Sequence, residues 1–302
     1  MADVLADILA KKHLEVEHAR RVTPVEALRE RAEYSAPLRD FFAAVATHAG
    51  GRLASPQAGD ATSDAASPGA AASDAAPTGA AAPGGALPRL IAEVKRASPS
   101  AGVIRADFDP VAIAQRYHAA GAAALSVLTD GPFFGGRLTD LAAIRSAVPL
   151  PLLRKDFIID AYQVHESRAA GADAILLIAE ALRDAELVDF VALARRIDLT
   201  VLLEVHEAES LERVQRLFPT PPTGVLLGIN NRDLKRQVVD IAHTERLAPR
   251  ARGAWPLVSE SGVRTRADVQ RLHAAGARAL LVGEALMRAD DPGGRIQELF
   301  AG

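Results

Sequence analysis

The sequence predicts a closed (β/α)8 barrel, the TIM-barrel architecture, with a helical extension and a low-complexity insertion before its first strand. Eight short apolar runs alternate with polar, helix-forming stretches over the last two thirds of the chain. A weak internal repeat recurs along the same region. The chain has 302 residues, and a barrel of this type needs about 250. One barrel therefore accounts for most of the chain.

The eight apolar runs are rich in branched residues and are nearly free of polar ones. Such runs are typical of strands that are buried on both faces of a parallel sheet. Stretches of roughly 10–20 residues with helical composition separate them, as a parallel sheet requires. The predicted strands are Leu90–Lys95, Ala124–Thr129, Leu152–Phe157, Ala174–Ile178, Thr200–Val205, Gly224–Ile229, Pro256–Ser261 and Ala279–Gly283.

The repeat has the form x-Ala-Ala-Gly-Ala and precedes three of the predicted strands. It occurs at His118–Ala122, Arg168–Ala172 and His273–Ala277, so its offsets are 50 and 105 residues. These offsets correspond to two and four strand–helix units. The glycine of each copy suits the left-handed position that ends a helix. An open doubly wound sheet is the alternative, but no glycine-rich dinucleotide turn follows an early strand.

The chain divides into three predicted segments. Residues 1–48 form a helical extension that packs on the barrel, residues 49–88 a flexible linker, and residues 89–302 the catalytic barrel. Within the linker, residues 54–86 contain only Ala, Gly, Ser, Thr, Pro, Asp and Gln. Without large apolar side chains, this tract cannot bury enough surface to offset the entropy of ordering it. We interpret it as a tolerated surface insertion.

Composition excludes several classes of function. The net charge of −3 is unlike the basic footprint of a general nucleic-acid binder. The absence of cysteine excludes disulfides, cysteine–zinc sites, iron–sulfur clusters and thiolate catalysis. No signal peptide and no apolar run long enough to span a bilayer is present, so we expect a cytoplasmic protein without membrane contact.

Charged and polar residues gather where the predicted strands end. The carboxyl ends of barrel strands build the active site, so these side chains are expected to converge. Lysine donates protons, and neighbouring carboxylates serve as bases. The set therefore predicts acid–base catalysis on an anionic substrate, with no cofactor and no metal. Its members are Glu93, Lys95, Lys155, Glu204, Asn230, Arg232, Glu260 and Glu284.

Two glycines predict a phosphate site at the ends of the last two strands. Gly262 and Gly283 lie where barrels commonly hold phosphate on backbone N–H groups. A metal site is not expected, because His206 beside Glu204 is the one histidine at a strand end. Nucleophilic catalysis by Ser261 lacks an evident histidine–acid relay.

At these residues the chain resembles the indole-3-glycerol-phosphate synthases of tryptophan biosynthesis. The resemblance covers everything except residues 54–86, and several independent motifs carry it. They are Ile91–Ser100, Leu125–Asp130, Leu153–Ile158, Ala172–Ile178, Leu203–His206, Gly228–Arg232, Ser259–Gly262 and Leu281–Ala285. The family converts 1-(2-carboxyphenylamino)-1-deoxyribulose 5-phosphate to indole-3-glycerol phosphate, with loss of CO₂ and water.

The resemblance implies roles for six catalytic residues. Lys155 resembles the general acid that protonates the ketone oxygen, and Lys95 the lysine that pairs with the substrate carboxylate. Glu204 corresponds to the acid–base partner in dehydration. Glu93, Asn230 and Glu260 match polar residues around the reacting carbons. The division of proton transfers between the two lysines is not readable from the residues.

The resemblance also implies the residues that bind the substrate. Arg232 and Ser261 match supporting positions, whereas Phe134, Phe157, Leu176 and Leu234 supply an apolar wall or serve as ordinary barrel packing. The phosphate is expected at Ser98, Gly262, Gly283 and Glu284. The chain departs from the family pattern at Gly131-Pro132, Arg137 and Gln237. No departure removes a predicted catalytic group.

Other functions stay open on the residues alone. A Schiff-base lyase or aldolase would use Lys155 as a nucleophile, and a non-catalytic barrel scaffold would present the low-complexity tract to a partner. Phosphoribosylanthranilate isomerase, a neighbouring barrel, relies on a catalytic cysteine that this chain lacks. We expect a small phosphorylated substrate as the partner. Association with other enzymes of tryptophan biosynthesis is not readable from the sequence.

Overall fold

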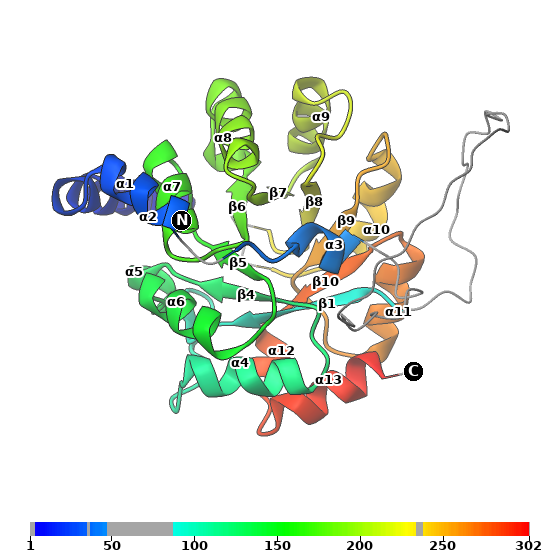
Figure 1. The fold of residues 1–302 in the computed structure, drawn as a ribbon. Coiled ribbons are helices and arrows are strands. Elements are labelled where there is room, and N and C mark those ends of the chain that lie inside the picture. The colour runs from blue at the N-terminus through cyan, green and yellow to red at the C-terminus, as the bar shows by residue number, and fades with distance from the viewer. Residues whose placement is uncertain (1–3, 35–36, 47–86, 234–237, 302) are drawn as a thin grey trace, which may run out of the picture.

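The computed structural model describes residues 4–34, 37–46, 87–233 and 238–301. Eight parallel strands close a barrel in the order β1-β10-β9-β8-β7-β6-β5-β4, with helices around it (Figure 1). The predicted (β/α)8 barrel is thus confirmed. The barrel strands are β1 (Arg89–Val94), β4 (Ala124–Leu128), β5 (Leu152–Lys155), β6 (Ala174–Ile178), β7 (Thr200–Val205), β8 (Val225–Asn230), β9 (Leu257–Glu260) and β10 (Ala279–Val282).

The strand boundaries differ from the predicted ones by one or two residues at most. The largest difference is at β5, which ends at Lys155, two residues before the predicted end. Asp156 leaves the strand because its carboxylate accepts hydrogen bonds from the N–H of Phe157 and the hydroxyl of Thr129. An additional short hairpin follows β1, formed by β2 (Ala97–Ser98) and β3 (Gly102–Val103).

Helices alternate with the strands around the barrel, and further helices precede its first strand. Among them, α4 and α7 begin at an aspartate that caps them, Asp109 and Asp160 respectively. The α-helices are α1 (Val4–Val22), α2 (Val25–Tyr34), α3 (Phe41–Ala46), α4 (Pro110–Ala119), α5 (Gly131–Phe134), α6 (Leu138–Ala147), α7 (Ala161–Ala169), α8 (Asp184–Arg196), α9 (Ala208–Leu217), α10 (Ala242–Leu247), α11 (Arg266–Ala274), α12 (Glu284–Met287) and α13 (Pro292–Phe300). Two 3₁₀ turns, η1 (Ala179–Ala181) and η2 (Ala248–Arg250), complete the described elements.

The helix α3 closes the amino-terminal end of the barrel. Phe41 and Val45 are fully buried and pack against the first residues of several strands, among them Ala124 and Ala279. Figure 1 shows α3 lying across the end of the barrel. The interior above it is filled by inward-facing side chains, so the barrel is a packed core. The opposite end, where the strands finish, is left for a site.

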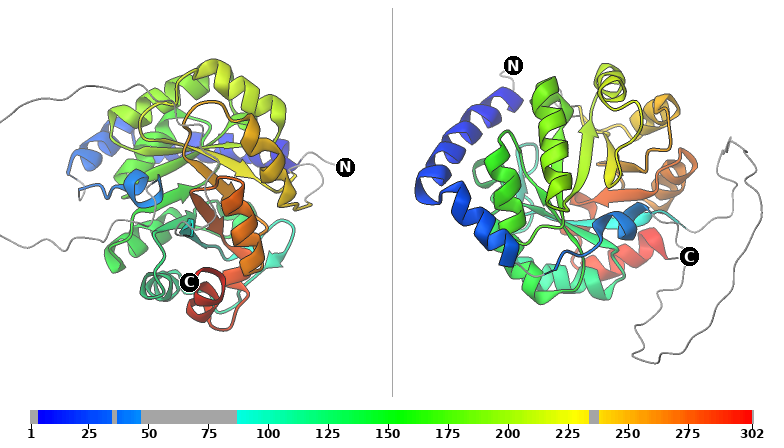
Figure 2. Two further views of the ribbon diagram at one scale, coloured as in Figure 1. Left: turned by 90° about the vertical axis from the view of Figure 1, so that its right-hand side faces the viewer. Right: turned by 45° about the horizontal axis from the view of Figure 1, so that its top comes forward.

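The helices α1 and α2 pack on the outside of the barrel against α7 (Figure 2). Val16 and Leu28 bury their side chains against Tyr162 of α7. The Tyr162 hydroxyl donates hydrogen bonds to the carbonyls of Ala19 and Thr23, 3.1 and 3.0 Å away. The extension is therefore fixed by both apolar and polar contacts.

Some sequence predictions fall outside the described residues. The predicted linker at 49–88 does so apart from its last two residues, and so do Leu234 and Gln237. In the parts of the chain that are described, no helix is long and apolar enough to cross a membrane.

Candidate active site

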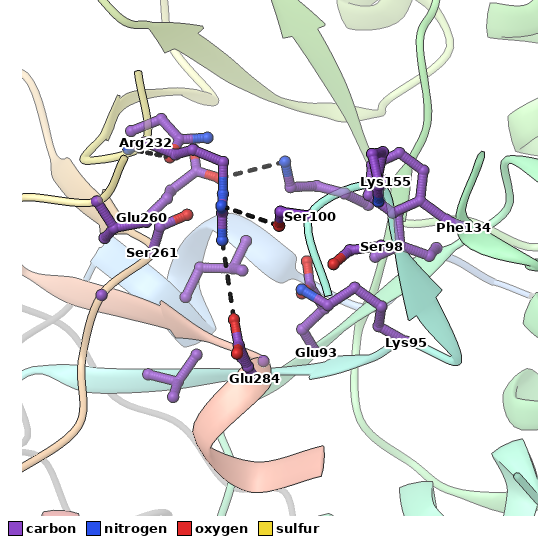
Figure 3. A pocket seen from close by; sticks show the side chains of 18 of the residues that line it. Glu93, Lys95, Ser98, Ser100, Phe134, Lys155, Arg232, Glu260, Ser261 and Glu284 are labelled. Atoms are coloured by element: carbon purple, nitrogen blue, oxygen red, sulfur yellow. Dashed lines mark hydrogen bonds and ion pairs between the residues drawn. The ribbon is translucent and has the colours of Figure 1, made fainter. Parts of the chain in front are cut away.

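A cavity of about 580 Å³ opens at the carboxyl ends of the barrel strands. All the predicted site residues that lie within the described ranges line it, and Figure 3 shows ten of the lining side chains with labels. The predicted residues brought together are Glu93, Lys95, Ser98, Phe134, Lys155, Phe157, Leu176, Glu204, Asn230, Arg232, Glu260, Ser261, Gly262, Gly283 and Glu284. Leu234 is the predicted member that lies outside the described residues.

Lys155, the last residue of β5, lies between two buried glutamates from different strands. Its Nζ is 2.9 Å from Oε2 of Glu204 and 3.4 Å from Oε2 of Glu260. Gly228 makes room for this arrangement, because a Cβ there would lie 2.4 Å from Oε1 of Glu260. The sequence analysis found the three charged residues but not the space that Gly228 provides.

The two glutamates differ in their tendency to ionise. Burial raises the pKa of Glu204, but the charges of Lys155 and His206 outweigh that effect and hold it below its usual value. Burial and the neighbouring charge of Glu204 raise the pKa of Glu260 well above its usual value. These shifts favour an ionised Glu204 beside a neutral Glu260, a division typical of acid–base sites.

Lys155 itself stays charged. Burial lowers the pKa of its ammonium group, but the negative charge of Glu204, with which it also shares a hydrogen bond, is the main cause that more than reverses this effect, so the pKa is raised. A lysine that acts as a nucleophile needs a lowered pKa and a neutral amine. The environment therefore favours Lys155 as a proton donor.

A second lysine–glutamate pair lies on β1 and the loop after it. Lys95 Nζ donates to Oε2 of Glu93. Gly283 leaves the space for this carboxylate, because a Cβ there would lie 2.2 Å from Oε2 of Glu93 and 3.1 Å from Nζ of Lys95. Gly283 therefore has a steric role beside the predicted backbone contact with phosphate.

Arg232 reaches across the mouth of the cavity after β8. Its guanidinium donates to Oγ of Ser100 at 3.1 Å and lies 3.8 Å from Glu284 (Figure 3). The backbone N–H of Arg232 donates to Oδ1 of Asn230 at 3.0 Å. Asn230 thereby shapes the turn that points Arg232 toward the cavity.

The end of β9 has an unusual backbone. Ser261 and Gly262 both adopt positive φ, 68° and 93°. A non-glycine residue with positive φ is uncommon and is often found at functional sites. The Ser261 conformation directs the chain away from the strand, and both residues line the cavity.

The apolar side of the cavity comes from two aromatic rings and from α1. The rings of Phe134 and Phe157 lie 6.2 Å apart, and Leu176 lines the cavity beside them. Val4, Leu5 and Ile8 of α1 also line it, which was not predicted from the sequence. Their spacing places them close together on α1, but no local signal in the sequence shows that this part of the helix covers the barrel mouth.

Lys12 anchors α1 beside these aromatic residues. It is 3% exposed, and its Nζ lies 2.9 Å from both Asp130 and Asp156. Asp130 also accepts from the N–H of Phe133 and caps α5, while Asp156 accepts from the N–H of Phe157. One buried ammonium group thus joins the extension to the two loops that bear the aromatic wall.

Three further arginines line the cavity beside the predicted phosphate residues. Arg264, Arg288 and Arg295 come from the elements that follow β9 and β10, near Gly262, Gly283 and Glu284. The sequence analysis did not single them out. Among the described residues, no group of three or more His, Asp or Glu side chains is arranged to hold a metal ion.

Comparison with known proteins identifies close relatives. The family model of indole-3-glycerol phosphate synthase matches residues 82–299. A protein of that name from Acidithiobacillus ferrooxidans is 46% identical over 300 residues, which is 99% of each chain. One from Rhodospirillum rubrum is 52% identical over 213 residues, covering 70% of this chain and 80% of the relative.

Solved structures with low sequence identity share the fold. A 3-hexulose-6-phosphate synthase superposes with a TM-score of 0.55 at 18% identity, covering 70% of this chain and 98% of that one. A mutant tryptophan synthase alpha-subunit from Pyrococcus furiosus gives a TM-score of 0.54 at 16% identity, covering 71% and 98%. At these identities the likeness concerns the barrel alone.

Proposed function

The chain belongs to the indole-3-glycerol phosphate synthase family, and we propose that the cavity at its barrel mouth carries out the ring closure by general acid–base catalysis. The activity is that of a lyase of tryptophan biosynthesis. The substrate is 1-(2-carboxyphenylamino)-1-deoxyribulose 5-phosphate, and the products are indole-3-glycerol phosphate, CO₂ and water. The observation that carries the mechanism is the position of Lys155 between an ionised Glu204 and a neutral Glu260.

Lys155 is the proposed acid of the first step. The aromatic carbon that bears the carboxylate attacks the ketone carbon, and the ketone oxygen takes up the electron pair of its double bond. That oxygen becomes an alkoxide, which is more basic than an amine, so a charged lysine can protonate it. Glu204 at 2.9 Å keeps the ammonium group charged and in place until then.

The second and third steps remove CO₂ and water. The carbon–carboxylate bond breaks, CO₂ leaves, and its electron pair restores the aromatic ring. The new hydroxyl then leaves as water while a proton of the five-membered ring goes to a base. We assign Glu204 as that base, because its lowered pKa keeps it ionised. One of the two lysines supplies the proton that the departing hydroxyl needs.

Lys95 is proposed to hold the substrate carboxylate. Its present counter-ion is Glu93, and the pair lies on the cavity wall. A carboxylate beside an ammonium group gains a charge-assisted hydrogen bond. Binding it at Lys95 orients the ring carbon toward the ketone, which is where much of the rate of such a reaction arises.

The remaining contacts are assigned by charge and polarity. We place the phosphate at Ser98, Gly262, Gly283 and Glu284, where Arg264 and Arg288 add positive charge. The aromatic ring of the substrate is placed against Phe134, Phe157 and Leu176, with Ser261 and Arg232 as supporting polar residues.

The three-segment organisation and the location remain proposals. We propose that residues 1–48 act as an extension of the barrel, 49–88 as a linker and 89–302 as the catalytic domain. The contacts of α1 and α2 with α7 support the first of these. We also propose a cytoplasmic location, which membership of a biosynthetic enzyme family supports.

The direct test is an assay of the purified protein with the carboxyphenylamino-deoxyribulose phosphate. Indole-3-glycerol phosphate is expected by its fluorescence, without added cofactor and with full activity after treatment with a chelator. Absence of product, or activity restored only by a divalent metal, would refute the mechanism. Borohydride trapping of a substrate adduct on Lys155 would support the Schiff-base alternative, which the raised pKa of Lys155 disfavours.

A further inference from the structure

His206 lies directly behind the proposed base, outside the cavity. It follows β7, is 6% exposed, and does not line the pocket. Its Nε2 is 3.2 Å from Oε1 of Glu204, the oxygen that does not face Lys155. Glu204 is therefore held between two positive groups, one on the cavity side and one on the outer side.

The other face of His206 is clamped by Glu180 of η1. The ring Nδ1 lies 3.1 Å from Oε2 of Glu180, and the backbone N–H of His206 donates to Oε1 at 2.8 Å. A neutral imidazole has one N–H donor, whereas both nitrogens here face a carboxylate oxygen. Nδ1 is hydrogen-bonded to Glu180, whereas Nε2 makes no hydrogen bond and meets Glu204 as a close charge contact. Two flanking carboxylates favour the imidazolium form of the ring.

The clamp itself is fixed from neighbouring elements. Arg213 of α9 donates to the carbonyls of Ala179 and Leu182, on either side of Glu180, at 2.7 and 2.6 Å. His243 of α10 places its Nε2 2.7 Å from the carbonyl oxygen of His206. Glu180 and His206 therefore have little freedom to turn away from Glu204.

We propose that His206, clamped by Glu180, is a positioning residue that holds Glu204 ionised and correctly oriented for the ring-closing reaction. The inference rests on the proposed function, because it assigns His206 a part in that reaction. Lys155 gives up its charge when it protonates the substrate, and at that moment Glu204 loses one of its two cationic neighbours. The imidazolium remains and keeps Glu204 a carboxylate.

The charged groups that face His206 support this assignment. Burial lowers the pKa of His206, and Lys155 lowers it further, but the hydrogen bond to Glu180 and the charges of Glu204 and Glu180 outweigh both and raise it. Burial raises the pKa of Glu180, yet its hydrogen bond to His206 and the charge of that ring lower it overall. Burial and the charge of Glu204 raise the pKa of Glu260, which lies against Lys155, and so favour its neutral form.

The experiment compares His206→Gln and Glu180→Gln with His118→Gln, an exposed histidine of α4 that serves as the matched control. Removing a positive charge next to a carboxylate raises its pKa, by about one unit or more at this range. We expect the acid limb of the kcat/KM profile of His206→Gln to move up by about one pH unit. KM should change less than twofold, because His206 does not touch the cavity. The control should match the wild type.

An independent readout uses the protein without substrate. Carboxyl-detected NMR of ¹³C-labelled glutamate follows the titration of Glu204 in wild type and variants, and it works even if the assay shows no turnover. An upward shift in His206→Gln supports the proposal, and failure of the assay alone would then count against the proposed function only. The proposal would be overturned if the pKa of Glu204 were unchanged in His206→Gln while kcat fell by the same factor at all pH values. His206 would then have a purely structural role.

The Glu180→Gln variant keeps the test decisive if His206→Gln does not fold. It retains the ring and removes the charge that clamps it, so a smaller shift in the same direction is expected. Because Glu180 acts through His206, the double variant should behave like His206→Gln alone. Additive losses in the double variant would contradict the proposed chain of contacts.

Discussion

Oε2 of Glu204 lies 2.9 Å from the ammonium nitrogen of Lys155, although Lys155 is the last residue of β5 and Glu204 the last but one of β7. Neither strand neighbours the other, since β6 runs between them. The contact forms across the barrel mouth, and both side chains are largely buried. Burying a charged pair carries a desolvation cost, and such pairs cluster at functional sites, which is why this pair carries the proposed mechanism.

Replacing Lys155 with methionine should remove the proton donor while keeping the length of the side chain. We expect kcat to fall by about 10²–10⁴, the usual share of general acid catalysis. KM should change little, because Lys95 holds the substrate carboxylate. Steady-state kinetics of Lys155→Met and of Lys11→Met, a lysine of α1 outside the cavity lining, check this. Near-normal turnover in Lys155→Met would mean that the proton comes from another group.

Glu204→Gln and Glu260→Gln should differ, although both change a buried glutamate by one atom. Glutamine imitates the neutral form, which is already the state of Glu260, so this variant should keep kcat within about tenfold. Glu204 works as a carboxylate, so its variant should lose at least about a hundredfold. Equal losses in kcat, measured at neutral pH, would contradict the assignment of the two protonation states.

Gly228→Ala should displace the side chain of Glu260 without adding or removing a charged group. The added methyl would lie 2.4 Å from Oε1 of Glu260 and 3.2 Å from Cδ1 of Leu202. Overpacking of this kind costs about 1–3 kcal/mol in the free energy of unfolding. The urea concentration at the midpoint of unfolding and kcat should both fall. Gly131→Ala, whose methyl would be 3.7 Å from its nearest neighbour, is the control and should be near neutral.

Lys12→Met should loosen α1. The change leaves Asp130 buried without its cation, whereas Asp156 keeps Arg154 3.0 Å away; removing one partner of a buried ion pair typically costs about 3–5 kcal/mol. Activity should fall too, because Val4, Leu5 and Ile8 line the cavity from that helix. Arg20 also lies on α1 and forms a more exposed ion pair with Asp160, which caps α7. Arg20→Met should therefore lower the free energy of unfolding by less than about 1 kcal/mol. If chemical unfolding shows that both variants lose the same free energy of unfolding, Lys12 does not hold α1 in place.

Deleting residues 58–82 should leave the catalytic rate unchanged if this stretch belongs to a linker. Shortening a linker from about 40 to about 15 residues lowers the entropic cost of closing it by roughly 0.9 kcal/mol, so the free energy of unfolding should rise slightly. Kinetics and thermal unfolding of the shortened chain check both points. A clear drop in kcat would show that the tract takes part in catalysis.

The sequence predicted the barrel and most of the site for one physical reason. The strand ends of a closed parallel barrel must meet, so residues such as Glu93, Lys155 and Glu260 could be assigned to one mouth without knowledge of any distance. Lys12 could not be found in this way. It pairs with Asp130 and Asp156 across 118 and 144 positions, and helical periodicity does not say what a helix packs against.

His206 shows a second limit of the same kind. The sequence shows that His206 follows β7 close to Glu204, but two such residues without a second histidine do not predict a metal site. Its orientation depends on Glu180, which comes from the neighbouring strand-to-helix turn. In the sequence, a glutamate on such a turn cannot be distinguished from one that is exposed to solvent. Only the structure shows that Glu180 contacts the His206 ring.

The closure of the amino-terminal end by α3 separates the two ends of the barrel for protein engineering. Phe41 and Val45 fill that end, and β1 starts there at Arg89, so the chain leaves α3 and re-enters the barrel on the face opposite the cavity. A reporter domain or a second enzyme joined to residues 46 and 87 would therefore be attached at the barrel end opposite the substrate entrance.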